Sequence, residues 1–188
     1  MKLYGLSYTS RAQKVLIAAQ YVGVDINVEE FHPRLQSEEA LAEYKKKNPN
    51  GLIPTLETPE GYLYESNAIL RYLGRYNDKA NIYGKNDFER ALIDQYLDWG
   101  VLTFEPVFLP VYFVSLGYVP YVKESFENDL EALKKCLRIL DNRLKQSKYL
   151  AGESLSIADI SIVSYLAFLF RFIFDEKFLK IIFENLSW

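Results

Sequence analysis

The chain has 188 residues, 49% of them hydrophobic and 25% charged, with 15 Tyr, 12 Phe and a net charge of −3. This composition supplies enough apolar side chains for a packed core and argues against a disordered protein. It also lacks the basic surface that nucleic-acid binding requires, because the longest cationic run is Lys45–Lys47. We therefore predict no direct contact with nucleic acid.

The single cysteine and the single histidine restrict the possible cellular compartment and the possible metal sites. Cys136 is the only cysteine, which excludes an internal disulfide or a CxxC redox pair and points to a reducing compartment. His32 is the only histidine, so we predict no metal site and place His32 in a surface loop. No signal-peptide layout opens the chain, and no uninterrupted apolar run reaches the roughly 18 to 20 residues of a membrane span. We expect a cytoplasmic protein without a membrane segment.

Strand-like and helix-like stretches alternate in the first part of the chain. A short strand is expected at Lys2–Tyr4, followed by a helix over Ser10–Tyr21 with Gly23 as its C-terminal glycine. Asp25–Glu29 alternates polar and apolar residues, as a half-buried strand does. Because the crossover between two such strands is right-handed, the second strand should run parallel to the first.

A short helix and a hairpin follow. We expect Ser37 to open the helix and Lys45–Lys47 to close it, since acidic residues near the start and lysines at the end both complement the helix dipole. Ile53–Glu57 and Tyr62–Glu65 are then expected to pair as a hairpin across a turn that contains proline and glycine.

The last helix of this part is expected to begin with Ser66 as its cap and to run to about Tyr76. The order βαβαββα is that of a thioredoxin-like α/β domain, which we assign to residues 1–77. A polar, turn-rich stretch follows, and only helical patterns come after it, so we assign an all-helical C-terminal domain to residues 86–188.

The C-terminal part should contain several helices. One is expected over Asp87–Leu102, after which some helix should persist through the prolines Pro106, Pro110 and Pro120. Ser125–Lys145 carries an apolar stripe at helical spacing. The stripe consists of Leu130, Leu133, Leu137, Leu140 and Leu144. Cys136 lies beside this stripe and should be buried and inert, and Ile160–Phe170 is expected to be a buried core helix.

The most specific motif joins Asn48–Leu56 to Glu65–Ile69. A proline that opens a strand after a turn can be cis, and this isomer would leave Ile53 free to pair with an extended peptide. Ser66 at a helix N-terminus offers a hydroxyl, backbone N–H groups and the positive end of the dipole to a carboxylate. Alternatively, Pro54 merely interrupts sheet pairing and Ser66 merely caps its helix. The residues assigned to a site for a γ-glutamyl-cysteinyl peptide are Ile53, Pro54, Glu65 and Ser66.

Together these motifs resemble the glutathione-binding half of the glutathione transferase family. Tyr149–Ile160 is similar to the capping segment that precedes the central helix of that family. Within it, Ser156 as N-cap and Asp159 at N3 form a variant of the capping box, with a structural role. The resemblance spans essentially the whole chain and implies the glutathione transferase fold, in which an all-helical domain follows a thioredoxin-like one. It also implies glutathione as a ligand or co-substrate.

Within that superfamily the chain most resembles the N-terminal domain of the gamma subunit of translation elongation factor 1, on Arg11–Ala12, Leu16–Tyr21, Tyr64–Ile69 and Leu137–Asp141. This resemblance implies a docking scaffold that holds the nucleotide-exchange subunit of the factor, a homodimer, and a longer chain that continues past Trp188. Two alternatives remain. The chain would be an active cytosolic glutathione transferase that conjugates glutathione to electrophiles, or a docking appendage of an aminoacyl-tRNA synthetase assembly.

An active enzyme would need a hydroxyl after the first strand to donate a hydrogen bond to the glutathione sulfur. Such a bond, worth about 1.5–3 kcal/mol, would lower the pKa of the thiol by about one to two units. In serine-type transferases this residue stands four positions before the arginine of the first helix, which implies Ser7. Its alternative role is that of a plain turn residue. Other hydroxyls nearby are those of Tyr4, Tyr8, Thr9 and Ser10.

Overall fold

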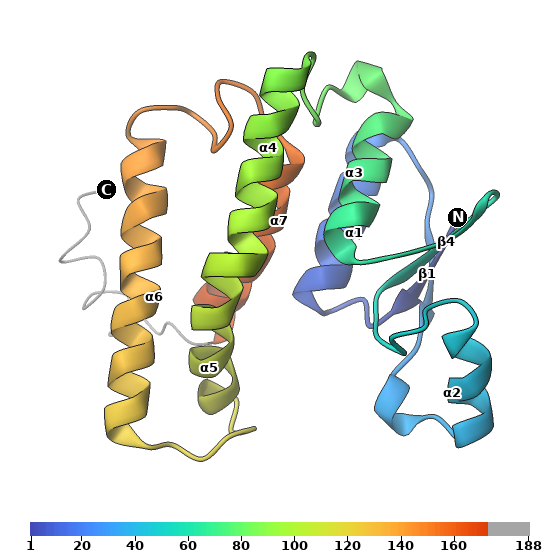
Figure 1. The fold of residues 1–188 in the computed structure, drawn as a ribbon, viewed down its shortest axis with the longest axis horizontal. Coiled ribbons are helices and arrows are strands. Elements are labelled where there is room, and N and C mark those ends of the chain that lie inside the picture. Colours follow the sequence, from blue (N-terminus) through green and yellow to red (C-terminus); the bar gives the residue numbers. More distant parts are fainter. Residues whose placement is uncertain (173–188) are drawn as a thin grey trace. The chain divides into compact units, whose positions relative to one another are not determined.

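The chain forms two compact units, Met1–Lys85 and a second one that begins at Asn86 (Figure 1). They are seen in a computed structural model that describes residues 1–172. The first unit is a four-stranded sheet with helices, and the described part of the second is helical. This is the α/β-then-helical fold class that the sequence predicts.

The sheet of the first unit has the strand order β2-β1-β3-β4. β1 (Lys2–Gly5) pairs in parallel with β2 (Asn27–Glu30) and antiparallel with β3 (Thr55–Thr58), and β4 (Gly61–Tyr64) pairs antiparallel with β3. The predicted parallel pairing and the hairpin are confirmed. β2 begins two residues later than predicted, because its register places Asn27 opposite Lys2.

Helices α1 (Ser10–Val22) and α3 (Ser66–Tyr76) pack against one another beside the sheet, whereas α2 (Glu38–Lys45) stands apart from them (Figure 1). Thr9 caps α1 by accepting a hydrogen bond from the N–H of Ala12. Gly23 ends the helix in the left-handed region at φ 71°, as expected of a C-terminal glycine. The core between helices and sheet is fully buried and includes Leu3, Val15, Leu56, Ile69, Leu70 and Leu73.

In the second unit, α4 (Asp87–Trp99) continues through a π-helical turn (Gly100–Phe104) directly into α5 (Glu105–Ser115). The expectation that helix persists through the prolines is confirmed as far as Ser115. Pro106 directly follows the π-helical turn, in the first turn of α5, and Pro110 lies inside that helix.

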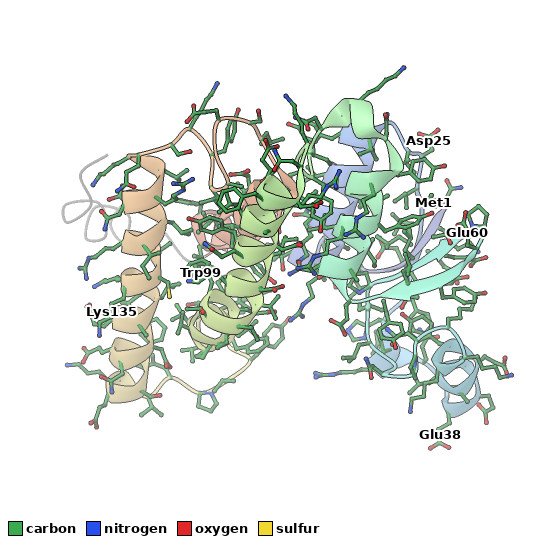
Figure 2. The ribbon with its side chains drawn as sticks, turned by 45° about the horizontal axis from the view of Figure 1, so that its top comes forward. Met1, Asp25, Glu38, Glu60, Trp99 and Lys135 are labelled. Carbon is green, nitrogen blue, oxygen red and sulfur yellow. The ribbon has the colours of Figure 1, made fainter. Side chains whose placement is uncertain are left out.

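Two further helices, α6 (Lys123–Leu144) and α7 (Ile157–Phe172), complete the described part of this unit. Trp99 packs against their common core, whereas the exposed Lys135 points outward from α6 (Figure 2). The buried core consists of Phe104, Phe108, Val111, Leu133, Cys136, Leu140, Leu150, Ile162, Tyr165 and Leu169. Cys136 is buried as expected, and its burial raises the pKa of the thiol. Leu144 was placed on the inner stripe, but it is 38% exposed because it ends the helix.

On length and composition alone, one helical stretch in the described part of the chain, Asp87–Ser115, could cross a membrane. This stretch is not an uninterrupted apolar run, because the charged residues Asp98 and Glu105 lie within it. Phe104, Phe108 and Val111 are nevertheless buried in the core of their own unit, which accounts for the apolar character of the helix.

Candidate functional site

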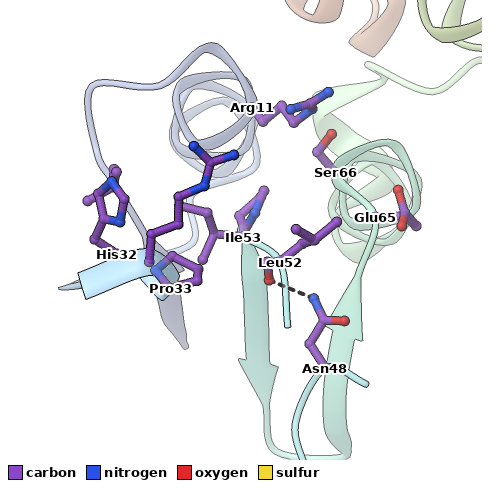
Figure 3. Close-up of a pocket in the computed structure, with 11 residues that line it drawn as sticks. Arg11, His32, Pro33, Asn48, Leu52, Ile53, Glu65 and Ser66 are labelled. Atoms are coloured by element: carbon purple, nitrogen blue, oxygen red, sulfur yellow. Dashed lines mark hydrogen bonds between the residues drawn. The ribbon is translucent and has the colours of Figure 1, made fainter. Parts of the chain in front are cut away.

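A pocket of about 380 Å³ lies in the first unit (Figure 3). Four segments line it: the stretch after β1, the loop after β2, the segment before β3 and the start of α3. The four residues predicted for the peptide site, Ile53, Pro54, Glu65 and Ser66, all line this one pocket. The sheet thus brings the two sequence motifs that contain these residues together at one pocket.

The segment before β3 is held by three buried side chains, Tyr44, Asn48 and Thr55. The Tyr44 hydroxyl and the Asn48 amide both donate to the carbonyl of Leu52, each at 2.7 Å (Figure 3 shows the Asn48 bond). The Asn48 amide also donates to the Thr55 hydroxyl at 3.1 Å, and the hydroxyls of Tyr44 and Thr55 lie 2.7 Å apart. Burial raises the pKa of Tyr44, so its hydroxyl remains a donor. We call these three residues the Asn48 clasp.

Ile53 lies in the short segment between Leu52, whose carbonyl the Asn48 clasp holds, and the start of β3. The Ile53–Pro54 peptide bond is cis, and the ladder of β3 starts only at Thr55. The predicted start of the strand at Ile53 is therefore wrong by two residues, and the backbone of Ile53 is left outside the sheet. Pro54 lies close to Gly5 at the end of β1, where an added Cβ would stand 3.6 Å from the Cβ of Pro54.

The start of α3 forms the opposite part of the lining. We expected Ser66 to be the cap, but Glu65 occupies that position, at φ 65° and ψ 110°, and Ser66 is the first helical residue. The prediction was wrong by one residue, because the helical backbone already begins at Ser66 and the cap position therefore falls on Glu65. A non-glycine residue at positive φ costs about 1–3 kcal/mol and often marks a functional site. The buried amide of Asn67 is also anchored, since its oxygen accepts from Lys14 Nζ at 2.6 Å.

Polar and charged side chains give the pocket its chemistry. Arg11, Arg34 and His32 line it together with one acid, Glu65 (Figure 3). His32 lies in a loop, as expected, and is half-buried. Its Nδ1 is buried and has no hydrogen-bond partner among the described residues. The N-terminus of α3 adds the positive end of its dipole. These groups suit a peptide that carries carboxylates, and glutathione fits that description.

Ser7, the predicted catalytic hydroxyl, belongs to the turn after β1 and is not among the residues that line the pocket. Its backbone N–H donates to both carboxylate oxygens of Glu30, at 3.2 and 3.3 Å. Sequence reasoning did not single out Glu30, because its contact with Ser7 depends on the pairing of β2 with β1.

The other hydroxyls considered in place of that of Ser7 lie elsewhere in the first unit. The Tyr4 hydroxyl donates to Glu57 at 2.5 Å and accepts from Lys47 Nζ at 2.6 Å, so it belongs to a polar cluster on the sheet. Thr9 is the cap of α1, and its own hydroxyl donates to the carbonyl of Leu6. Ser10 is the first residue of α1, and Tyr8 is 61% exposed. These four residues do not line the pocket either.

The predicted structural cap lies in the second unit. One oxygen of the Asp159 carboxylate accepts from the N–H and the hydroxyl of Ser156 at 2.9 and 2.8 Å. The other oxygen accepts from the N–H of Leu150 at 2.8 Å. Asp159 thus ties the start of α7 to the loop before it. Within residues 1–172 no group of three or more His, Cys, Asp or Glu side chains is placed to hold a metal ion.

Comparison with known proteins identifies the family to which this fold belongs. The glutathione S-transferase N-terminal domain matches residues 1–75, and the glutathione S-transferase C-terminal domain matches residues 92–187. A theta-class glutathione S-transferase from the citrus canker pathogen Xanthomonas axonopodis pv. citri, solved with glutathione bound, is 28% identical with a TM-score of 0.83. The match covers 93% of this chain and 84% of that one.

Among curated proteins, elongation factor 1-gamma 1 of Oryza sativa subsp. japonica is 36% identical over 177 residues, which make up 94% of this chain and 42% of that protein. Elongation factor 1-gamma-A of Xenopus laevis is 32% identical over 179 residues, or 94% of this chain and 40% of that protein. The chain thus spans about two fifths of the length of these relatives. Because the two domain families together match most of its residues, the chain belongs to the glutathione S-transferase family.

Proposed function

We propose that this chain is the glutathione-transferase-like domain of an elongation factor 1-gamma-type protein and serves as a docking scaffold in the elongation factor complex. Its partner is the nucleotide-exchange subunit, its setting is the cytoplasm, and its assembly is a homodimer. The observation that carries the proposal is the similarity over 94% of the chain to proteins named elongation factor 1-gamma in both a plant and an animal.

The pocket supports a binding role better than a catalytic one. It keeps the groups that a glutathione-class peptide requires, with Ile53 outside the sheet ladder and Ser66 at the start of α3. The hydroxyl proposed to activate the thiol, that of Ser7, belongs to a turn next to the carboxylate of Glu30. A carboxylate opposes the formation of a nearby thiolate. The pocket is therefore proposed to bind glutathione or a related peptide with little or no turnover.

Docking is tested with the purified chain and a recombinant nucleotide-exchange subunit of elongation factor 1. We expect the two to co-elute in size-exclusion chromatography and to give a saturable heat of binding. A cytosolic glutathione transferase of similar size is the control and should elute alone. Capture from cells would separate the remaining alternatives, because recovery of aminoacyl-tRNA synthetases without the exchange subunit would overturn the proposal in favour of the synthetase appendage.

A second candidate, a cytosolic glutathione transferase acting on electrophiles, is favoured by the lining of the pocket. It requires retention on immobilised glutathione and turnover of an aryl halide that Ser7→Ala abolishes. Ser10→Ala serves as the matched control, since Ser10 is already helical. Turnover well above the uncatalysed rate and sensitive to Ser7→Ala would replace docking without catalysis by this second function.

A further inference from the structure

Glu30 reaches across from β2 to the turn that follows β1. It is the last residue of β2 and lies opposite Gly5 in the parallel pairing. This register brings its carboxylate to the backbone N–H of Ser7, which donates to Oε1 at 3.2 Å and to Oε2 at 3.3 Å. The N–H of Phe31 donates to the carbonyl of Gly5 at 3.0 Å, so the strand end that carries Glu30 is itself fixed.

This turn adjoins the pocket. Leu6 and Arg11 on either side of it line the pocket, and Gly5 lies against Pro54. Ser7 itself does not line the pocket, but the lining residues Leu6 and Arg11 flank it, so a ligand thiol that reaches between these two residues would meet the turn that contains Ser7. The groups that could act on that thiol are the N–H and hydroxyl of Ser7 and the carboxylate of Glu30.

Glu30 affects both the availability of the Ser7 N–H and the charge near a bound thiol. A backbone has one N–H per residue, and the N–H of Ser7 already donates to Glu30, so it is withdrawn from a thiolate. The carboxylate also adds a negative charge next to the place where the thiolate would form. Among the other charged groups around the pocket, Arg11 and Arg34 favour a thiolate and Glu65 opposes it. His32 also lines the pocket.

We propose that Glu30 is a specificity residue that keeps the thiol of a bound γ-glutamyl-cysteinyl peptide protonated, so that the pocket holds the thiol peptide without activating it. This inference rests on the proposed binding of glutathione by the pocket. No bond to carbon or sulfur is made or broken in the step, because the thiol only retains its proton.

Glu30→Gln tests the inference, because it removes the charge and keeps the shape of the side chain. With glutathione bound, the thiol of this variant should titrate with a pKa about one unit lower than in the unaltered chain. The thiolate fraction below that pKa then rises about tenfold. Both quantities are followed by the ultraviolet absorbance of the thiolate across a pH series. Glu29→Gln is the matched control: it changes the same charge on the same strand, and Glu29 pairs with Lys2 at 3.1 Å.

A second measurement avoids any substitution. If the bound thiol is kept protonated, the affinity of the unaltered chain for glutathione should fall as the pH rises past the ordinary thiol pKa of about 8.5. The affinity for S-methylglutathione, which has no thiol proton, should not show this fall. Calorimetric titrations of both peptides over the same pH range give the comparison.

The outcomes separate this inference from the function on which it rests. If glutathione binds but Glu30→Gln leaves the pKa of its thiol unchanged, or if affinity rises with pH, the role of Glu30 is overturned while the binding site stands. If neither peptide binds the unaltered chain, the proposed glutathione site and the role of Glu30 fall together, whereas docking to the exchange subunit is judged by its own experiment.

Discussion

Both units of this chain have a buried apolar core, and the first unit also carries the pocket. In the first unit, hydrogen bonds of the buried side chains of Asn48 and Thr55 hold the segment before β3, which is part of the pocket lining. The second unit is built on a dense aromatic core in which the Phe104 ring lies 6.0 Å from both Phe108 and Tyr165. Substitutions in the pocket lining of the first unit should therefore alter ligand affinity, whereas substitutions in the aromatic core of the second unit should lower folding stability.

The largest effect is expected from Phe104→Ala. The side chain is fully buried, and its removal leaves a cavity that the surrounding helices cannot fill. We expect a loss of about 3–5 kcal/mol in the free energy of unfolding, measured by chemical denaturation. Leu102→Ala, which removes a 76% exposed side chain in the same π-helical turn, should cost at most about 0.5 kcal/mol. Similar losses from the two variants would contradict the assignment of the core to this unit.

Asp159→Ala should have the next largest effect. It leaves the N–H groups of the buried residues Leu150 and Ser156 without their acceptor. The expected loss is about 2–3 kcal/mol, because unsatisfied buried donors are costly. Thermal unfolding and amide exchange at the start of α7 give the measurement, with the exposed Glu153→Ala as control. Unchanged exchange at Ser156 would show that another acceptor replaces the carboxylate.

In the first unit, Asn48→Ala should separate binding from stability. It removes one of the two donors to the Leu52 carbonyl and should cost about 1–2 kcal/mol of stability. Because the freed segment contains Ile53, the affinity for glutathione should fall at temperatures where the variant is still folded. Asn50→Ala is the control, since Asn50 is exposed and uses its backbone N–H to bind Asn48. An unaltered affinity would show that the Asn48 clasp does not contribute to glutathione binding.

The smallest expected effect is a pH dependence of folding stability that arises from Glu57 on the sheet. A hydrogen bond from Tyr4, helped by the charges of Lys47 and Lys2, lowers the pKa of Glu57 below its ordinary value. A carboxyl with a lowered folded pKa stabilises the fold above its unfolded pKa, and that contribution is lost as the pH falls through the folded value. Glu57→Gln should therefore flatten the decrease in Tm between about pH 5 and about pH 3. If the unaltered chain and the variant lose the same Tm over that range, the Tyr4 contact contributes nothing.

Local patterns were sufficient to predict most elements and several residues of the pocket lining. The helical stripe of α6 and the turn chemistry around Gly23 depend only on neighbouring residues. The Gly23 prediction was confirmed, and the stripe was confirmed except at Leu144. The residues assigned to the peptide site also lie together in one pocket. The helix cap was predicted one residue too late, at Ser66, and the start of β3 two residues too early, at Ile53, because both depend on packing with distant segments.

The sequence by itself determined the order of strands and helices, the glutathione transferase resemblance and the motif from Asn48 to Ser66, because these depend on spacing along the chain. Only the tertiary structure decided which side chains surround the turn at Ser7. Glu30 lies 23 residues away from Ser7 in the sequence, and the parallel register of β1 and β2 is what makes them neighbours. A register shift of one residue would point the Glu30 side chain to the other face of the sheet, since successive side chains alternate.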